Sequence, residues 1–160
     1  QRWTAPRDVH ADGWRIAGCP VNGPVVVAEG ATVCVAWYTE AEGTPELRAA
    51  RSTDSGDTFA APVTLAKGPH VLGRLGLARG DGHLLVSWLE QAPDERQTLV
   101  LGRYDDAWRQ AHHVRVATLS ARGRASGIPR LQWHDDAALL VWTDVAGDVP
   151  GLHGARVTWP

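Results

Sequence analysis

The densest group of side chains that could do chemistry lies in residues 51–59, which read R-S-T-D-S-G-D-T-F. One carboxylate, Asp54, stands between the hydroxyl groups of Ser52 and Thr58. In a turn, an Asp side chain accepts hydrogen bonds from backbone N–H groups, and nearby hydroxyl groups can close the same turn. A glycine two positions later allows the positive φ that such a turn uses. The spacing therefore predicts a structural turn, with the Phe59 ring entering the core, made by Ser52, Asp54, Gly56, Thr58 and Phe59.

Other ligand chemistries fit the chain less well. A calcium loop would need more carboxylates at alternate positions and a distal Glu, which this run lacks. None of the seven His has a ligand spacing with Cys or carboxylates. His112 and His113 are adjacent on an expected strand and so point to opposite faces. No phosphate loop, nucleophile elbow or zinc-protease motif occurs. We therefore predict no metal and no cofactor.

The chain has two cysteines, Cys19 and Cys34, which could form a disulfide in an oxidising compartment. However, Cys34 occupies the same repeat position as Leu85 and Leu139, where a strand is expected to be buried. A buried free Cys packs as a small hydrophobic residue. We favour two free thiols over a bridge.

The composition is that of one ordinary domain. The chain has 160 residues, 44% hydrophobic and 21% charged, which is enough for one core. A net charge of −2 gives no field that would attract nucleic acid. No apolar run approaches the roughly 20 residues of a membrane span. Neither a nucleic acid nor a membrane is therefore an expected partner.

The elements that position these residues come from an internal repeat of about 50 residues. Trp37, Trp88 and Trp142 are 51 and 54 residues apart. Further markers repeat in the same order, namely Gly23, Gly73 and Gly127, and Arg51, Arg103 and Arg156. Because a residue repeated in every unit is usually part of the scaffold, we expect the Trp rings to wedge the units together. We expect the Arg side chains to pair with turn carboxylates.

Each unit reads as four short strands separated by turn signals. First strands are expected at Pro24–Ala28, Arg74–Ala78 and Ile128–Gln132. Second strands are expected at Thr32–Tyr38, His83–Leu89 and Ala137–Thr143. Third strands are expected at Glu46–Ser52, Thr98–Tyr104 and Leu152–Val157. Fourth strands are expected at Pro62–Ala66, at His113–Thr118 and, for the third unit, at the start of the chain over Trp3–His10.

Twelve strands in this order predict an all-β chain of three four-stranded blades, which is half of a six-bladed β-propeller. The whole of 1–160 is one segment, with units at about 1–10 plus 127–160, 23–66 and 73–118. Three blades do not close a ring. Either two copies form a six-bladed homodimer, or the chain is the C-terminal half of a longer protein whose N-terminal half lies elsewhere. We favour the second, since the chain has no Met and begins within a unit.

The S-x-D-x-G-x-T-F spacing resembles the Asp box of sialidase-type, or bacterial neuraminidase, repeats (BNR repeats). Residues 12–24, 72–74, 86–90 and 125–130 are similar to segments of bacterial exo-sialidase-like repeat proteins. The resemblance covers nearly the whole chain and implies an Asp-box propeller of six blades. It also implies a secreted or periplasmic protein, with the Asp boxes on the side away from the ligand.

The same resemblance suggests site residues. Sialidases use a Tyr nucleophile assisted by a Glu, an Asp as acid/base and three Arg that clamp the substrate carboxylate. The family's Arg-Ile-Pro motif appears here in reversed order, as Ile128-Pro-Arg130, so two of the three Arg at most are matched. The catalytic candidates are Tyr38, Glu40 and Glu90. The ligand-binding candidates from the resemblance are Arg74 and Arg130. Asn22 is added because its loop, Cys19–Pro24, leads into a first strand at the expected channel mouth, although a structural turn is favoured over a site for this loop.

These observations favour a sialidase-like propeller that binds a glycan or other small ligand at its central channel, without catalysis by this chain alone. The first alternative is an exo-sialidase-type glycoside hydrolase in the assembled ring. The second is a protein-interaction scaffold. Since fold does not imply function, the choice depends on the site.

Overall fold

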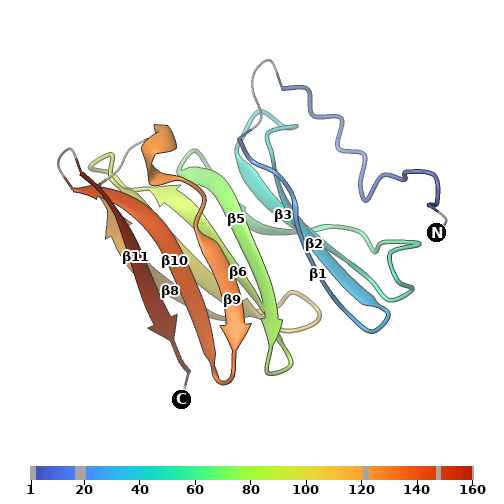
Figure 1. Ribbon diagram of the computed structural model, residues 1–160. Coiled ribbons are helices and arrows are strands. Elements are labelled where there is room, and N and C mark those ends of the chain that lie inside the picture. Colours follow the sequence, from blue (N-terminus) through green and yellow to red (C-terminus); the bar gives the residue numbers. More distant parts are fainter. Residues whose placement is uncertain (1–2, 17–20, 121–122, 147–148, 160) are drawn as a thin grey trace.

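The computed structural model describes residues 3–16, 21–120, 123–146 and 149–159. Within these ranges, eleven strands form three antiparallel sheets (Figure 1). The first sheet contains, in order, β1 (Val25–Glu29), β2 (Thr32–Thr39), β3 (Glu46–Ser52) and β4 (Val63–Lys67). The second contains β5 (Val71–Gly80), β6 (His83–Gln91), β7 (Gln97–Tyr104) and β8 (Gln110–Leu119). The third contains β9 (Arg130–His134), β10 (Ala137–Ala146) and β11 (Val149–Val157), preceded by the 3-10 helix η1 (Gly123–Ser126). The chain is thus all-β, as predicted.

In each sheet a two-residue turn joins the first strand to the second. The last strand pairs before these turns are Glu29↔Thr32, Gly80↔His83 and His134↔Ala137. Turns of this length need positive φ, and Gly30 (56°), Asp81 (50°) and Asp135 (53°) supply it. The turn residues therefore fix where these strand pairs begin.

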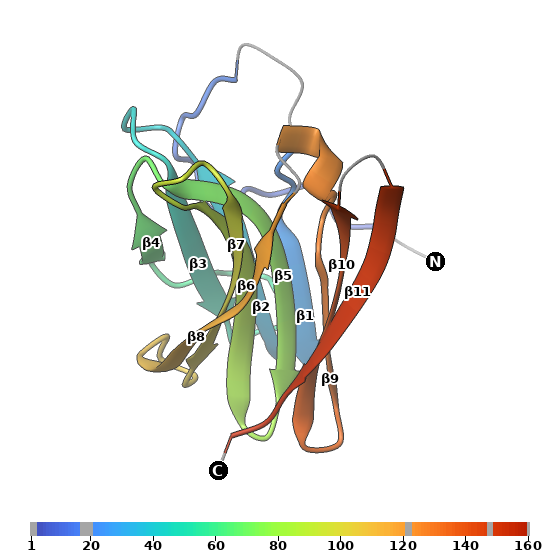
Figure 2. The ribbon, with the colours of Figure 1, turned by 90° about the vertical axis from the view of Figure 1, so that its left-hand side faces the viewer.

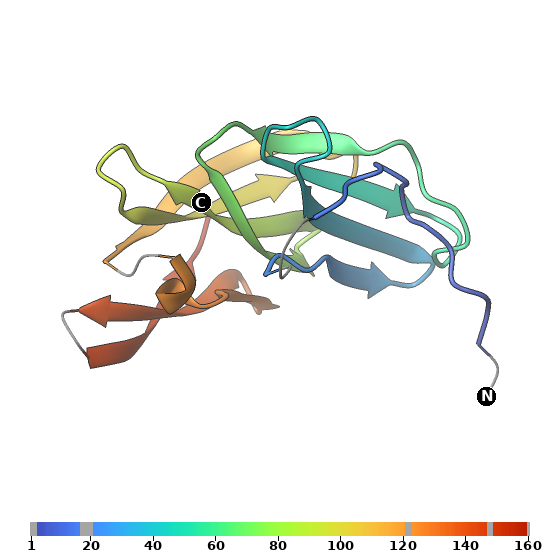
Figure 3. The ribbon, with the colours of Figure 1, turned by 90° about the horizontal axis from the view of Figure 1, so that it is seen from above.

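The three sheets are stacked, with the second between the other two (Figures 2 and 3). We call the buried contact between the first and second sheets the first seam, and that between the second and third the second seam. The first seam contains Cys34, Tyr38, Leu47, Val86 and Trp88. The second seam contains Leu85, Leu89, Leu99, Leu140 and Trp142. Both faces of the second sheet are therefore apolar and covered.

The repeated Arg residues and two of the three repeated Trp residues act in the scaffold as expected. Trp88 and Trp142 are buried in the two seams, whereas Trp37 is half-buried on the outer face of the first sheet. Each repeated Arg pairs with an Asp of a turn, in the pairs Arg51–Asp106 (3.6 Å), Arg103–Asp81 (3.2 Å) and Arg156–Asp136. Cys34 is a buried free thiol in the first seam, and Cys19 lies outside the described residues.

The expected strand over Trp3–His10 is not formed, because residues 3–16 contain no strand. This segment lies beside the first sheet, and the third sheet lies at the other end of the stack (Figures 1 and 3). The segment of a single chain therefore does not reach β11, which pairs only with β10 among the described residues. The assignment of residues 1–10 to the third unit stays a prediction.

The turn after β3 has the hydrogen bonds that the spacing predicts. Asp54 Oδ1 accepts from the Ser52 hydroxyl at 2.6 Å and from the Thr58 N–H at 2.9 Å, and its Oδ2 accepts from the Thr58 hydroxyl at 2.6 Å. Ser52 Oγ accepts from the N–H of Gly56, whose φ is 90°. Phe59 is half-buried rather than in the core. Asp105 makes the equivalent turn before β8 and accepts from the Arg109 N–H at 2.9 Å.

These donors lower the pKa of Asp54 to about 2, through the Ser52 and Thr58 hydroxyls and the Thr58 N–H. A carboxylate whose pKa is lowered by folding stabilises the folded state at any pH above its ordinary pKa of about 4. This stabilisation is lost as the pH falls toward the pKa of the folded state. We therefore expect Asp54→Asn to reduce the drop in melting temperature between about pH 5 and pH 2. Asp57→Asn is the control, since no described residue donates to its carboxylate. Identical pH profiles for Asp54→Asn and wild type would contradict this role.

Gly80 allows Trp133 to pack in the second seam. A Cβ at Gly80 would lie 2.0 Å from Trp133 Cγ. Overpacking of this kind costs about 1–3 kcal/mol. Gly80→Ala should lower the free energy of unfolding in urea by that amount. Gly23→Ala should leave it nearly unchanged, because no atom of the described residues lies within 4 Å of a Cβ there. Equal effects of the two substitutions would contradict the packing described.

Candidate functional site

All six candidate residues lie at one end of the sheets. First strands start and second strands end there, whereas the β1–β2 turn and the Asp54 turn lie at the opposite end. Asn22, Arg74 and Arg130 stand at or near the starts of first strands, and Tyr38, Glu40 and Glu90 at or just past the ends of second strands. The candidates are therefore on one side of the molecule, away from Asp54.

Three of the six line one pocket of about 350 Å³, which we call the Tyr38 pocket. Its walls come from the N-terminal segment, the residues before β1 and the end of β2. The lining residues are Trp14, Arg15, Ile16, Val21, Asn22, Tyr38 and Glu40. The pocket thus combines aromatic rings with an amide, a carboxylate and a guanidinium group.

Tyr38 and Glu40 are hydrogen-bonded, with the phenol donating to Glu40 Oε1. The Tyr38 side chain is buried, and the Trp14 ring packs edge-on against it at 5.7 Å between centroids. Burial and the hydrogen bond to Glu40 raise the pKa of Tyr38 above its ordinary value of about 10. At neutral pH Tyr38 is therefore a protonated phenol that donates to Glu40.

Asn22 links the first sheet to the second. Its Nδ2 donates to the Leu72 carbonyl at 3.2 Å, and its Oδ1 accepts from the Arg74 N–H at 2.8 Å. A Cβ at Gly73 would lie 2.7 Å from Asn22 Oδ1, so this contact requires the glycine. The amide is therefore engaged in the scaffold, although it also lines the Tyr38 pocket.

Arg74 makes the equivalent link from the second sheet to the third. Its Nη1 donates to Ser126 Oγ at 2.6 Å and to the Gly127 carbonyl at 2.5 Å. Burial lowers the pKa of this guanidinium. Asn22, Arg74 and Ser126 are spaced by 52 residues, so one inter-sheet clamp repeats with the sequence. Arg74 thus joins the second sheet to the residues before the third sheet and stabilises the second seam.

The remaining two candidates lie apart from the Tyr38 pocket. Arg130 is exposed on the face of the third sheet that is turned away from the second, since its neighbour Leu131 packs into the second seam. Glu90 accepts from the Trp88 indole N–H at 2.9 Å and lines a separate pocket of about 330 Å³ with His70 and Arg115. The structure does not gather Arg74 and Arg130 with the Tyr38–Glu40 pair.

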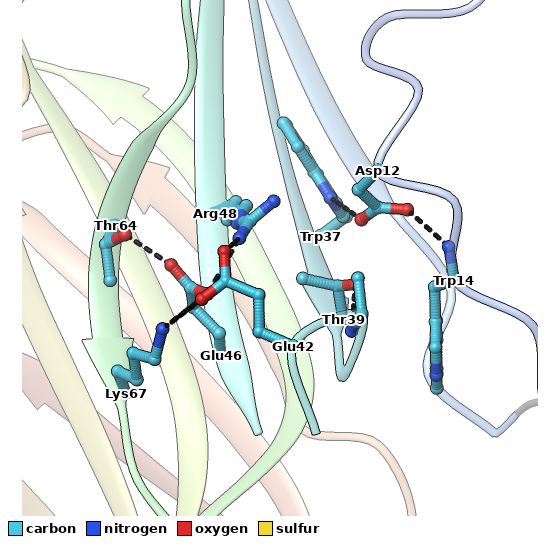
Figure 4. Close-up of polar contacts among 10 residues, drawn as sticks. Asp12, Trp14, Trp37, Thr39, Glu42, Glu46, Arg48, Thr64 and Lys67 are labelled. Atoms are coloured by element: carbon cyan, nitrogen blue, oxygen red, sulfur yellow. Dashed lines mark hydrogen bonds and ion pairs between the residues drawn. The ribbon is translucent and has the colours of Figure 1, made fainter. Parts of the chain in front are cut away.

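A polar network that sequence reasoning missed holds Trp14, a residue of the pocket wall (Figure 4). Asp12 Oδ2 accepts from the Trp37 indole N–H at 3.3 Å, and its Oδ1 accepts from the Trp14 N–H at 3.1 Å. This carboxylate holds the N-terminal segment against β2 and so places Trp14 in the pocket wall. The D-G-W order of residues 12–14 was the available signal.

A second part of this network surrounds Glu46, which is buried at the start of β3. Its carboxylate accepts from Arg48 at 3.0 Å and from the Thr64 hydroxyl, and Lys67 lies 3.5 Å away. Burial opposes ionisation, but the hydrogen bonds from Arg48 and Thr64 outweigh it and lower the pKa of Glu46. These pairs join β3 to β4 (Figure 4).

No protein-family model matches this chain, and a search of curated proteins finds no similar sequence. The fold and the site therefore define the class directly, as an all-β protein of three stacked antiparallel sheets with a pocket at one end.

Two further observations concern the described residues alone. They contain no helix long and apolar enough to cross a membrane. Within the same ranges, no three side chains of the types His, Cys, Asp and Glu gather as metal ligands would.

The Tyr38–Glu40 bond predicts a shift in tyrosine titration. Burial, followed by the nearby Glu90 carboxylate, raises the pKa of the other tyrosine, Tyr104, to about 12. In a Tyr104→Phe background, ultraviolet absorbance should show Tyr38 ionising well above pH 10. Adding Glu40→Gln should lower that value, because the negative charge is removed. Glu95→Gln, on an exposed turn, is the control. An unchanged titration after Glu40→Gln would contradict the described bond.

Proposed function

We propose that this chain is part of a sialidase-like β-propeller that binds a glycan in the Tyr38 pocket, without catalysis by this chain alone. The observation that carries the proposal is the gathering of Asn22, Tyr38 and Glu40 in one pocket at the end opposite the Asp54 turn. The repeated strands and stacked sheets support the propeller. The resemblance to exo-sialidase-like proteins supports a location outside the cytoplasm.

The lining of the pocket suits a sugar. The Trp14 and Tyr38 rings offer apolar surface to the carbon-bound hydrogens of a pyranose ring. The carboxylate of Glu40 accepts hydrogen bonds, as sugar hydroxyls require. Arg15 adds a guanidinium group, which pairs well with an acidic substituent. A volume of about 350 Å³ is within the range of small-ligand sites. A monosaccharide unit, including an acidic one, is therefore the ligand we propose.

Catalysis is not part of the leading proposal, because the substrate clamp is missing from the pocket. Arg74 donates to Ser126 and Gly127, and Arg130 lies on another face. In addition, the raised pKa of Tyr38 keeps the phenol protonated at neutral pH. A phenol in that state is a poor nucleophile unless its proton is removed during the reaction.

One observation favours the enzyme as a second candidate. The Tyr38 hydroxyl donates to Glu40, so a carboxylate is in place to take the phenol proton if a substrate is attacked. Release of a fluorogenic aryl sialoside tests this candidate. Loss of release in both Tyr38→Phe and Glu40→Gln would support it, and no release by the parent protein would remove it.

Binding is tested by titrating the chain with N-acetylneuraminic acid and, separately, galactose, with heat and Trp fluorescence as readouts. Trp14→Ala should weaken binding by at least about tenfold, which corresponds to about 1.4 kcal/mol. Trp3→Ala is the matched control, since Trp3 is exposed outside the pocket. No binding of either sugar at millimolar concentration by the folded chain would contradict the proposal, as would equal effects of the two substitutions.

A further inference from the structure

One of three equivalent leucines in the internal repeat is exposed, whereas the other two are buried. Leu47, Leu99 and Leu152 are 52 and 53 residues apart and occupy the same place on the third strand of each sheet. Leu47 and Leu99 are 0% exposed, whereas Leu152 is 78% exposed. Transfer of a Leu side chain from water to a packed seam is favourable. The exposure of Leu152 therefore marks an uncovered face of the third sheet. It is equivalent to the covered faces of the first and second sheets that carry Leu47 and Leu99.

The repeat identifies what covers this type of face. In the first seam, Cys34 and Leu47 of the first sheet pack with Val86 and Trp88 of the second. In the second seam the equivalent residues meet in the same way, with Leu85 and Leu99 packing with Leu140 and Trp142. Each seam therefore pairs the leucine face of one sheet with the tryptophan face of the next.

One leucine face and one tryptophan face remain without a sheet against them. The outer face of the third sheet carries Leu139, Val141 and Leu152, and Val141 is 40% exposed. The outer face of the first sheet carries Val35 and Trp37, at the positions of Val86 and Trp88. A cavity of about 370 Å³ adjoins these two side chains, beneath Val9 and His10. Because the two faces lie at opposite ends of one stack, a single chain cannot bring them together (Figure 3).

The free edge of β11 and the N-terminal segment are also complementary. β3 pairs with β4, and β7 with β8, but β11 has no fourth strand beside it among the described residues. Residues Trp3-Thr-Ala-Pro6 align with Phe59-Ala-Ala-Pro62, which places Arg7–Ala11 over the residues of β4. This segment lies in extended form beside the outer face of the first sheet (Figure 1). An unpaired strand edge readily accepts such a segment from another chain.

We propose that the outer face of the third sheet and the edge of β11 bind a second copy of this chain. The leucine face of each copy packs on the Val35–Trp37 face of the other, and residues 7–11 of each copy add a fourth strand to β11 of its partner. A twofold axis satisfies both faces and both edges at once. The resulting dimer has six four-stranded sheets and six equivalent seams. This proposal does not rest on glycan binding, although the cavity beside Val35 and Trp37 shares Trp14, Asn22 and Tyr38 with the Tyr38 pocket.

The test is the mass of the full chain by light scattering. The proposal predicts about 35 kDa, twice the 17.3 kDa chain. Leu152→Asp should raise the dimer dissociation constant by at least about a hundredfold, because it places a charge in the new seam. Val149→Asp is the matched control, since Val149 is 72% exposed on the opposite face of β11 and should leave the mass unchanged.

A second variant tests the added strand. Val9→Pro removes an N–H from a segment that forms no strand within one chain, and should raise the dissociation constant by at least about tenfold without changing the circular dichroism of the monomer. A wild-type mass near 17 kDa overturns the proposal. An oligomer other than a dimer also overturns it. Equal masses for Leu152→Asp and Val149→Asp also overturn it. If the wild-type chain is monomeric but still binds a sugar, the dimer proposal fails and the proposed function is retained.

Discussion

The contact between neighbouring sheets is the constraint on which the structure depends. A four-stranded sheet of this size has two faces, and the second sheet is apolar on both, so it is stable only with a sheet on each side. Leu99 on one face and Trp88 on the other are almost fully buried for that reason. The order of the three sheets follows from this requirement, because the first and third sheets each offer one matching face. The position of the Tyr38 pocket depends on the same stacking, because the pocket lies at one end of the first seam.

Polar clamps fix the two ends of the seams. At the pocket end, Asn22 and Arg74 donate across the seams to uncharged acceptors, so no carboxylate has to be desolvated there. At the opposite end, Arg79 of the second sheet pairs with Glu29 of the first sheet at 2.7 Å and with Asp106 of its own sheet at 2.7 Å. Charged hydrogen bonds of this kind have restricted geometry. The clamps therefore help to set how one sheet lies on the next.

Much of the local structure could be predicted from the sequence, because it depends on near neighbours or on the repeat. The bounds of β3, the two-residue turns and the bonds of Asp54 are of this kind. The path of residues 3–16 could not be predicted, since it depends on contacts such as Asp12 with Trp37 that lie far apart in the sequence. Arg130 shows a second limit. A change of one residue in strand register moves a side chain to the other face, and the sequence does not settle that register alone.

Amide hydrogen exchange on β3, β7 and β11 at two chain concentrations tests the dependence on seams most directly. These strands carry Leu47, Leu99 and Leu152 at one repeat position, but β7 lies in the sheet that is covered on both faces. We expect the β7 amides to exchange most slowly at both concentrations, and exchange of the β11 amides to become slower as the concentration rises. Equal protection of all three strands at both concentrations, or slower exchange in β11 than in β7, would contradict it.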